Sequence, residues 1–218
     1  MIPLLMVHGW AFDASFWDPM RERLTDFPIR CIDLGFSGRA DRPGLRRPLV
    51  VAHSMGLAWA LATVPRPWAG LLAINAFPAF TRTASFVDGV SPRVVERMRA
   101  RFGEDPRGVT AEFLARCGLP QADLSGLRAK PLGEALDWLA VCDERAALAE
   151  LDCPVRALAG TADVIVPQSM SRALYARHDL YLLERAGHLL PLTHPDWVEA
   201  HLRDFAAQVA SPVALEEP

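Results

Sequence analysis

The chain has 218 residues, 51% of them hydrophobic and 22% charged, with a formal net charge of -3 at neutral pH. This length and composition allow one substantial core, so we expect a single domain over residues 1–218 and exclude a disordered protein. The near-neutral charge argues against a nucleic-acid-binding protein and gives no general attraction to a membrane surface. The chain has four cysteines, and their spacing is typical neither of metal ligands nor of a disulfide framework: Cys31, Cys117, Cys142 and Cys153.

Apolar runs alternate with helical patterns along the chain, as in strands buried on both faces of a parallel sheet. We expect six strands, which begin near Ile2, Ile29, Leu49, Leu71, Val155 and Leu180. The predicted fold class is therefore α/β, a mostly parallel six-stranded sheet flanked by helices, without an N-terminal antiparallel hairpin. The first residues lack a basic region and a cleavage site, so we expect no signal peptide, no transmembrane span and a cytoplasmic address. Residues 211–218 are expected to form a loose acidic tail.

The first strand stops at the tripeptide His8-Gly9-Trp10. Glycine permits a sharp turn, after which the amide of Trp10 could face a developing oxyanion. After the second strand, residues 33–48 contain glycine, proline and arginine without an amphipathic period. Since a parallel crossover usually carries a helix, we expect that helix to be absent here or a single turn.

The third strand ends in Ala52-His53-Ser54-Met55-Gly56 and leads into a helix-forming stretch. This small-x-Ser-x-Gly pattern predicts a nucleophile elbow, a strained strand-to-helix turn that exposes the serine hydroxyl. The amide of Met55, directly after Ser54, is the second expected oxyanion donor. Strand alternation sends His53 to the opposite face from Ser54, so we assign it a packing role.

Between the fourth and fifth strands the alternation lapses, and residues 79–130 form a predicted helical lid insert. Ser91-Pro92 begins one helix that runs through Phe102, and Asp105-Pro106 begins a second that ends near Gly118. Residues 81–130 carry nine basic and six acidic side chains, a net charge of +3 that leaves -6 for the rest. This asymmetry suggests an anionic partner, although a solvated helix face would look similar.

Two polar residues follow the last two predicted strands. Asp163 lies in the loop after Leu158-Ala159-Gly160, and His188 follows Leu180–Leu183. A serine hydroxyl needs a base, and the base needs an acid to orient it. We therefore predict Ser54, Asp163 and His188 as catalytic residues of a serine hydrolase that needs no metal and no organic cofactor.

The elbow, the His8-Gly9-Trp10 turn, Asp163 and His188, in the chain order Ser, Asp, His, resemble the α/β-hydrolase superfamily over nearly the whole chain. Within it, Trp10 and the insert from Phe80 to Leu114 resemble the pimeloyl-acyl-carrier-protein methyl ester carboxylesterases of biotin synthesis, in a compact variant. This resemblance implies a serine carboxylesterase whose lid arginines hold an acidic acyl carrier protein. The nearest candidates for that contact are Arg93, Arg97, Arg107 and Arg116.

Aromatic side chains are candidate walls for an aliphatic acyl chain, although aromatic residues near an insert also serve as core: Phe77, Phe80, Trp17 and Trp138. Two other functions stay open. One is a broad hydrolase of small esters or lactones, and the other is a non-catalytic, hydrolase-like binding protein. We expect a monomer that contacts neither nucleic acid nor a membrane.

Overall fold

The structure, a computed structural model, describes residues 1–210, and the predicted tail at 211–218 lies outside them. Within the described residues six strands form one sheet, and every neighbouring pair runs parallel. The order is β2-β1-β3-β4-β5-β6, with bounds β1 Leu4–Val7, β2 Ile29–Ile32, β3 Leu49–His53, β4 Gly70–Ile74, β5 Val155–Gly160 and β6 Asp179–Leu183. The predicted α/β class is confirmed, and each strand begins within two residues of its predicted start.

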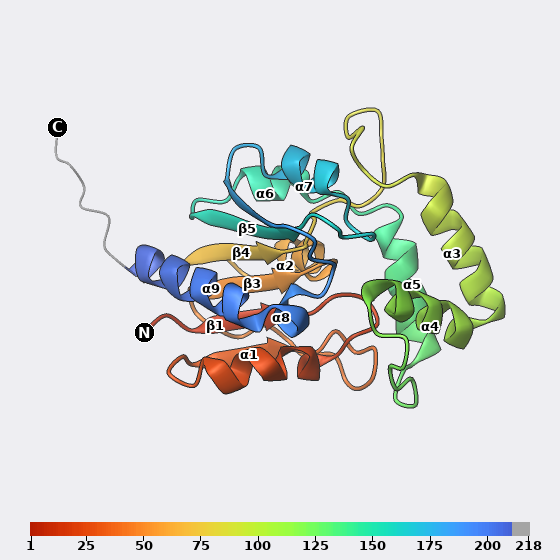
Figure 1. Cartoon of the computed structure of the whole chain (residues 1–218), viewed down its shortest axis with the longest axis horizontal. Helices are drawn as coiled ribbons and strands as arrows, with labels where there is room; N and C mark the ends of the chain where they lie inside the picture. The colour runs from red at the N-terminus through yellow and green to blue at the C-terminus, as the bar shows by residue number, and fades with distance from the viewer. Residues whose placement is uncertain (211–218) are drawn as a thin grey trace.

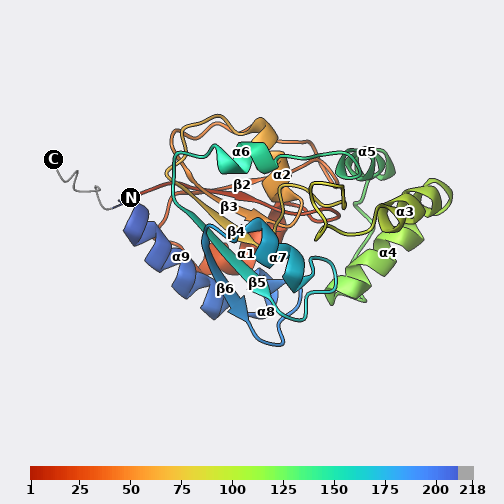
Figure 2. The ribbon, with the colours of Figure 1, turned by 90° about the horizontal axis from the view of Figure 1, so that it is seen from above.

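Helices cover both faces of the sheet (Figure 2). One face carries η1 (Ala14–Trp17), α1 (Asp18–Arg23), α8 (Leu190–Thr193) and α9 (Pro195–Ala210), and the other carries α2 (Gly56–Thr63) and α6 (Arg145–Ala149). A further helix, α7 (Gln168–Leu174), connects β5 to β6. Leu4 and Met6 of β1 belong to the core on the first face, whereas Leu5 and Val7 belong to the core on the second. Because successive side chains of a strand point to opposite faces, both faces demand apolar residues, which explains the continuous apolar runs.

The connection from β2 to β3 has the predicted irregular form. Among the described residues, positions 33–48 contain no helix. The loop turns back on itself, since the Asp41 amide donates to the Asp33 carbonyl oxygen at 2.9 Å and the Asp33 amide donates to the Asp41 carboxylate at 3.2 Å.

Of the four helices between β4 and β5, three gather at one end of the molecule, away from the start of β1 and the end of α9 (Figure 1). They are α3 (Pro92–Glu104), α4 (Pro106–Cys117) and α5 (Ala129–Leu139), and we call them the cap helices. The Asp105 side chain caps α4 by accepting from the Gly108 amide at 2.8 Å, and Gly118 ends α4 with a left-handed φ of 107°. The two predicted helices of the insert are therefore present. The expected insert boundary at 130 falls inside α5, which packs against α3.

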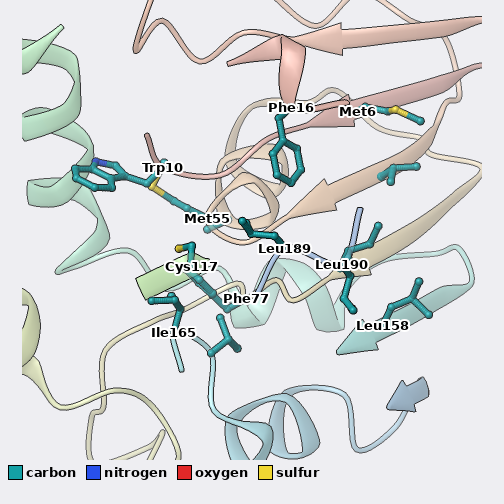
Figure 3. Packing of buried hydrophobic residues seen from close by; sticks show 14 of the residues in the cluster. Met6, Trp10, Phe16, Met55, Phe77, Cys117, Leu158, Ile165, Leu189 and Leu190 are labelled. Atoms are coloured by element: carbon teal, nitrogen blue, oxygen red, sulfur yellow. The ribbon is translucent and has the colours of Figure 1, made fainter. Parts of the chain in front are cut away.

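Two ion pairs tie the cap helices together. Arg99 of α3 contacts Asp137 of α5 at 2.6 Å, and Arg101 of α3 contacts Glu112 of α4 at 2.7 Å. Apolar packing continues from the sheet to the cap helices. One buried cluster contains Met55, Phe77 and Ile165 together with Cys117 of α4 (Figure 3). No helix within residues 1–210 has both the length and the apolar composition needed to cross a bilayer.

Candidate active site

Ser54 occupies the sharp turn between β3 and α2. Its φ is 55°, in the left-handed region that non-glycine residues rarely adopt. A Cβ on Gly56 would lie 2.5 Å from the His8 carbonyl oxygen and 2.6 Å from that of Val7. Only glycine therefore lets the start of α2 pass the end of β1 this closely. This is the geometry of a nucleophile elbow.

The structure brings the three predicted catalytic side chains into one hydrogen-bonded chain. His188 Nε2 lies 3.1 Å from Ser54 Oγ, and His188 Nδ1 lies 2.8 Å from Asp163 Oδ2. All three are buried, with exposed fractions of 4% for Ser54, 8% for Asp163 and 2% for His188. Since Nδ1 faces a carboxylate it carries the proton, which leaves the lone pair of Nε2 directed at the serine hydroxyl.

Asp163 accepts four hydrogen bonds. Its Oδ1 accepts from the amides of Ile165 at 2.8 Å and Val166 at 2.9 Å. Its Oδ2 accepts from His188 and, at 2.6 Å, from Nδ2 of Asn75. Asn75 directly follows β4, and our sequence analysis missed it. The available signal was a polar residue at the carboxyl end of a fully apolar strand.

His53 does more than pack. Its ring stacks on Phe16 with centroids 4.6 Å apart, and its Nε2 donates to the His188 carbonyl oxygen at 2.9 Å. Nδ1 of His53 is buried and has no hydrogen-bond partner among the described residues. Burial, and secondarily the nearby charge of His188, hold the pKa of His53 well below 6.5. His53 is therefore a neutral residue that supports the backbone of His188.

The turn after β1 is fixed by a buried histidine. The Leu34 amide donates to Nε2 of His8 at 3.1 Å, so the proton of His8 resides on Nδ1, which donates to the Gly9 carbonyl oxygen at 2.8 Å. Burial lowers the pKa of His8, which keeps this neutral form. Within residues 1–210, neither the Trp10 amide nor the Met55 amide donates to another protein group. Both are thus available to an oxyanion.

The Trp10 side chain joins this turn to the cap helices. Its Nε1 donates to the Leu132 carbonyl oxygen of α5 at 2.9 Å. Its ring meets Phe102 of α3 and Phe113 of α4 edge to face, at centroid distances of 6.0 and 4.9 Å. Figure 3 shows the indole pointing away from the strands toward the cap.

A cavity of about 240 Å³ opens above Ser54, between the sheet and the cap helices. Its lining is largely apolar and includes Trp10, Met55, Phe77, Phe80, Phe113 and Ile165. Arg116 is the one charged residue among the described residues that line it. The cavity can therefore take an aliphatic chain with a polar group at its mouth.

Two of the four predicted wall residues line this cavity, and two do not. Phe77 and Phe80 line it, with their ring centroids 4.7 Å apart. Trp17 is fully buried in the core and packs edge to face on Phe16, so its assignment to the wall was wrong. Trp138 of α5 is half-buried and packs against the core, and it is not among the residues that line the cavity.

A groove of about 330 Å³ between α3 and α4 adjoins the cavity. The two share Val94, Met98, Phe113 and Arg116 as lining residues, and the groove adds Arg97 and Arg101. Arg101 is neutralised by Glu112, whereas Arg97 and Arg116 have no carboxylate partner within residues 1–210. The groove therefore presents two uncompensated guanidinium groups beside the cavity.

The remaining predicted arginines lie elsewhere. Arg93 is exposed one turn before Arg97 on α3 and does not line the groove. Arg107 is nine residues before Arg116, about two and a half helical turns, which directs it to the opposite side of α4. There it borders a separate depression with Leu124 and Leu127. Arg107 is therefore not among the arginines that line the groove.

Comparisons with known proteins identify the family of this chain. The model of the alpha/beta hydrolase family matches residues 39–201. The chain is 31% identical to the pimeloyl-[acyl-carrier protein] methyl ester esterase of Xanthomonas oryzae pv. oryzae, over 94% of this chain and 95% of that protein. It is 25% identical to the biotin biosynthesis bifunctional protein of Cellvibrio japonicus, over 96% of this chain but only 48% of that protein.

Among solved structures, a thermophilic esterase from Thermogutta terrifontis superposes with a TM-score of 0.75. The two chains are 23% identical, and the superposition covers 97% of this chain and 91% of the other. Among residues 1–210, no group of three or more histidine, cysteine or carboxylate side chains is arranged to hold a metal ion. From the family match and the full-length relatives, the chain belongs to the alpha/beta hydrolase family and is a carboxylic ester hydrolase.

Proposed function

We propose that this hydrolase is a serine carboxylesterase in which Ser54 is the nucleophile, His188 the general base and Asp163 the residue that orients the base. The observation that carries the proposal is the buried chain of contacts, 3.1 Å from Ser54 to His188 and 2.8 Å from His188 to Asp163, beneath an apolar cavity. Those distances are within the reach that proton transfer requires.

In the proposed mechanism, His188 Nε2 takes the proton of Ser54 as Oγ attacks the ester carbonyl carbon. The amides of Trp10 and Met55 stabilise the oxyanion, and each such donor contributes about 100- to 1,000-fold to turnover. Collapse of the intermediate expels the alcohol, which receives its proton from His188. Water then attacks the acyl-enzyme with His188 again as base, which releases the acid and restores Ser54. Asp163 holds the imidazole ring in place and offsets the charge of protonated His188.

We propose the methyl ester of pimeloyl-acyl-carrier protein as substrate, so that the enzyme acts in biotin biosynthesis. The names of the curated relatives support this assignment. The largely apolar cavity suits the five methylenes of a pimeloyl chain, whose burial contributes about 4 kcal/mol at about 0.8 kcal/mol per methylene. Arg97 and Arg116, which have no carboxylate partner within residues 1–210, suit the acidic carrier and the phosphate of its prosthetic arm. In this proposal the cap helices are the lid of a monomeric, single-domain cytoplasmic enzyme.

The chemistry is tested by replacing Ser54 with alanine. We expect kcat for a short activated ester to fall about 10,000-fold or more, and labelling by a serine-directed phosphonate to disappear, while the fold is kept. Unchanged ester cleavage in the folded variant would show that the reaction takes place elsewhere. Failure of the unaltered enzyme to react with either reagent would instead support a non-catalytic binding protein.

The substrate is tested by charge reversal in the groove. Arg97→Glu and Arg116→Glu should each lower kcat/KM for pimeloyl-carrier-protein methyl ester at least about tenfold. Arg97→Glu should leave a short free ester unaffected. The matched control is Arg177→Glu, because Arg177 is exposed and precedes β6 at the opposite edge of the sheet. Equal rates on both substrates for all variants would favour a broad hydrolase of small esters or lactones.

A further inference from the structure

Asn75 lies between the acid and the base of the proposed site, although it belongs to neither segment. It follows β4, is 1% exposed and has a φ of 45°, a left-handed conformation that asparagine tolerates better than most residues. Its Nδ2 donates to Asp163 Oδ2 at 2.6 Å and to the Gly187 carbonyl oxygen at 2.8 Å. Its Oδ1 accepts from the Gly160 amide at 3.2 Å. One amide therefore links the ends of β4 and β5 to the segment that carries His188.

The carboxylate of Asp163 depends on this amide because it has few other sources of compensation. Within residues 1–210, no lysine or arginine pairs with Asp163, and His188 is its one basic partner. Two main-chain amides hold Oδ1, so rotation of the carboxyl group is limited on that side. Oδ2 is shared by Asn75 and His188 alone, and the Asn75 bond therefore sets how Oδ2 meets Nδ1 of His188.

We propose that Asn75 is a positioning residue that aligns Asp163 with His188 and simultaneously anchors the residue before the base. The proposal depends on the proposed roles of Asp163 and His188. It does not assign Asn75 a contact with the substrate, since Asn75 is not among the residues that line the cavity. Loss of the amide should consequently affect kcat and leave KM almost unchanged.

Asn75→Asp is the most informative variant, because aspartate keeps the shape and tolerates the left-handed backbone but replaces the donor with a carboxylate. Two carboxylates this close repel each other when both are ionised, so the pair holds one shared proton at low pH. As the pH rises that proton leaves, and repulsion moves Asp163 from His188. The ratio of variant to unaltered kcat/KM should therefore fall as pH increases, by at least about tenfold between about pH 5.5 and 9.

Three neighbouring titratable groups do not account for this pH dependence of kcat/KM. Burial, and then the charge of Asp163, raise the pKa of Cys117 to about 12. Burial also raises the pKa of Tyr175 and, as the main cause, lowers that of His53. Cys117 and Tyr175 therefore stay neutral in this pH range and do not produce the expected pH dependence.

The experiment measures kcat and KM for a short activated ester across this pH range for Asn75→Asp, Asn75→Gly and Tyr175→Phe. Asn75→Gly keeps the backbone conformation accessible and should lower kcat about 10- to 100-fold, with KM within about threefold. Tyr175→Phe is the matched control, because it removes a buried hydrogen bond of 2.8 Å to the carbonyl oxygen of Ala76, the next residue, without touching Asp163. It should lower the melting temperature by a few degrees and leave kcat and the pH profile unchanged.

A pH-independent ratio for Asn75→Asp, or losses in Asn75→Gly no larger than in Tyr175→Phe, would overturn the positioning role and reduce Asn75 to a structural residue. Ser54→Ala measured in parallel separates the two proposals. If Ser54→Ala loses activity while the Asn75 variants retain it, only the inference about Asn75 fails. If Ser54→Ala retains activity, the proposed function fails with it.

Discussion

Replacing Gly9 by alanine measures how closely the turn after β1 approaches the proposed nucleophile. A Cβ at this position would lie 2.8 Å from Ser54 Cβ, 3.1 Å from His53 Nδ1 and 3.3 Å from Ser54 Oγ. Carbon atoms are in favourable contact at about 3.5 to 4.0 Å, so Ser54 or the turn must move by about 0.7 Å or more. The displaced atoms belong to the attacking residue and to the amide beside it.

A misplacement of about 1 Å at reacting groups can cost about 100-fold in rate, whereas overpacking costs about 1 to 3 kcal/mol of stability. We therefore expect Gly9→Ala to fold and to lose about 10- to 100-fold in kcat. The assay is hydrolysis of an activated ester, normalised to active sites titrated with a phosphonate. Gly187→Ala is the matched control, because a Cβ there meets nothing within 4 Å although it adjoins His188. Full kcat in folded Gly9→Ala, or equal losses in both variants, would refute the argument.

Three further predictions concern stability. Burial lowers the pKa values of His8 and His53, so the unfolded chain binds more protons than the folded chain below about pH 6.5. The free energy of unfolding should therefore fall as the pH decreases from there, by up to about 1.4 kcal/mol per pH unit for each histidine. Urea titrations at several pH values measure this free energy, and a profile that does not change with pH would contradict the prediction. Trp10→Phe removes the hydrogen bond to the Leu132 carbonyl oxygen and should lower the free energy of unfolding by about 1 kcal/mol, with faster proteolysis inside the cap helices. Unchanged cleavage rates would mean that the indole does not anchor the cap helices. Asp105→Ala removes the side-chain cap of α4 and should lower the free energy of unfolding, measured by thermal unfolding, by about 1 kcal/mol. An unchanged melting temperature would mean that solvent replaces the cap at no loss.

The strands and the proposed catalytic residues were accessible from the sequence for one physical reason. Strands buried on both faces are continuous apolar runs, so the residue at which each strand ends can be identified from the sequence. Parallel strands present those ends at one edge of the sheet, so the sequence alone predicts that Ser54, Asp163 and His188 converge. The starts of α3 and α4 were equally accessible, because Ser91-Pro92 and Asp105-Pro106 are local signals.

The direction of a side chain within a known element could not be predicted from the sequence. Trp17 and Phe80 were both predicted to line the pocket for the acyl chain, yet Trp17 is buried in the core and Phe80 lines the cavity. Arg107 and Arg116 are both basic residues of α4, but only Arg116 faces the groove. Which side of a helix meets a cavity depends on the helix packed against it, and no local pattern carries that information.

The sequence alone determined the order of elements, the elbow and the chemistry available at the strand ends, because these follow from local propensity and from the geometry that all parallel sheets share. Only the tertiary structure decided that Asn75 reaches Asp163, that His53 supports the backbone of His188 and that Trp10 joins the turn to the cap. These contacts join residues between 88 and 135 positions apart. The packing of strands and helices against one another decides which residues make these contacts. The neighbouring residues in the sequence therefore do not predict the partner of Asn75, His53 or Trp10.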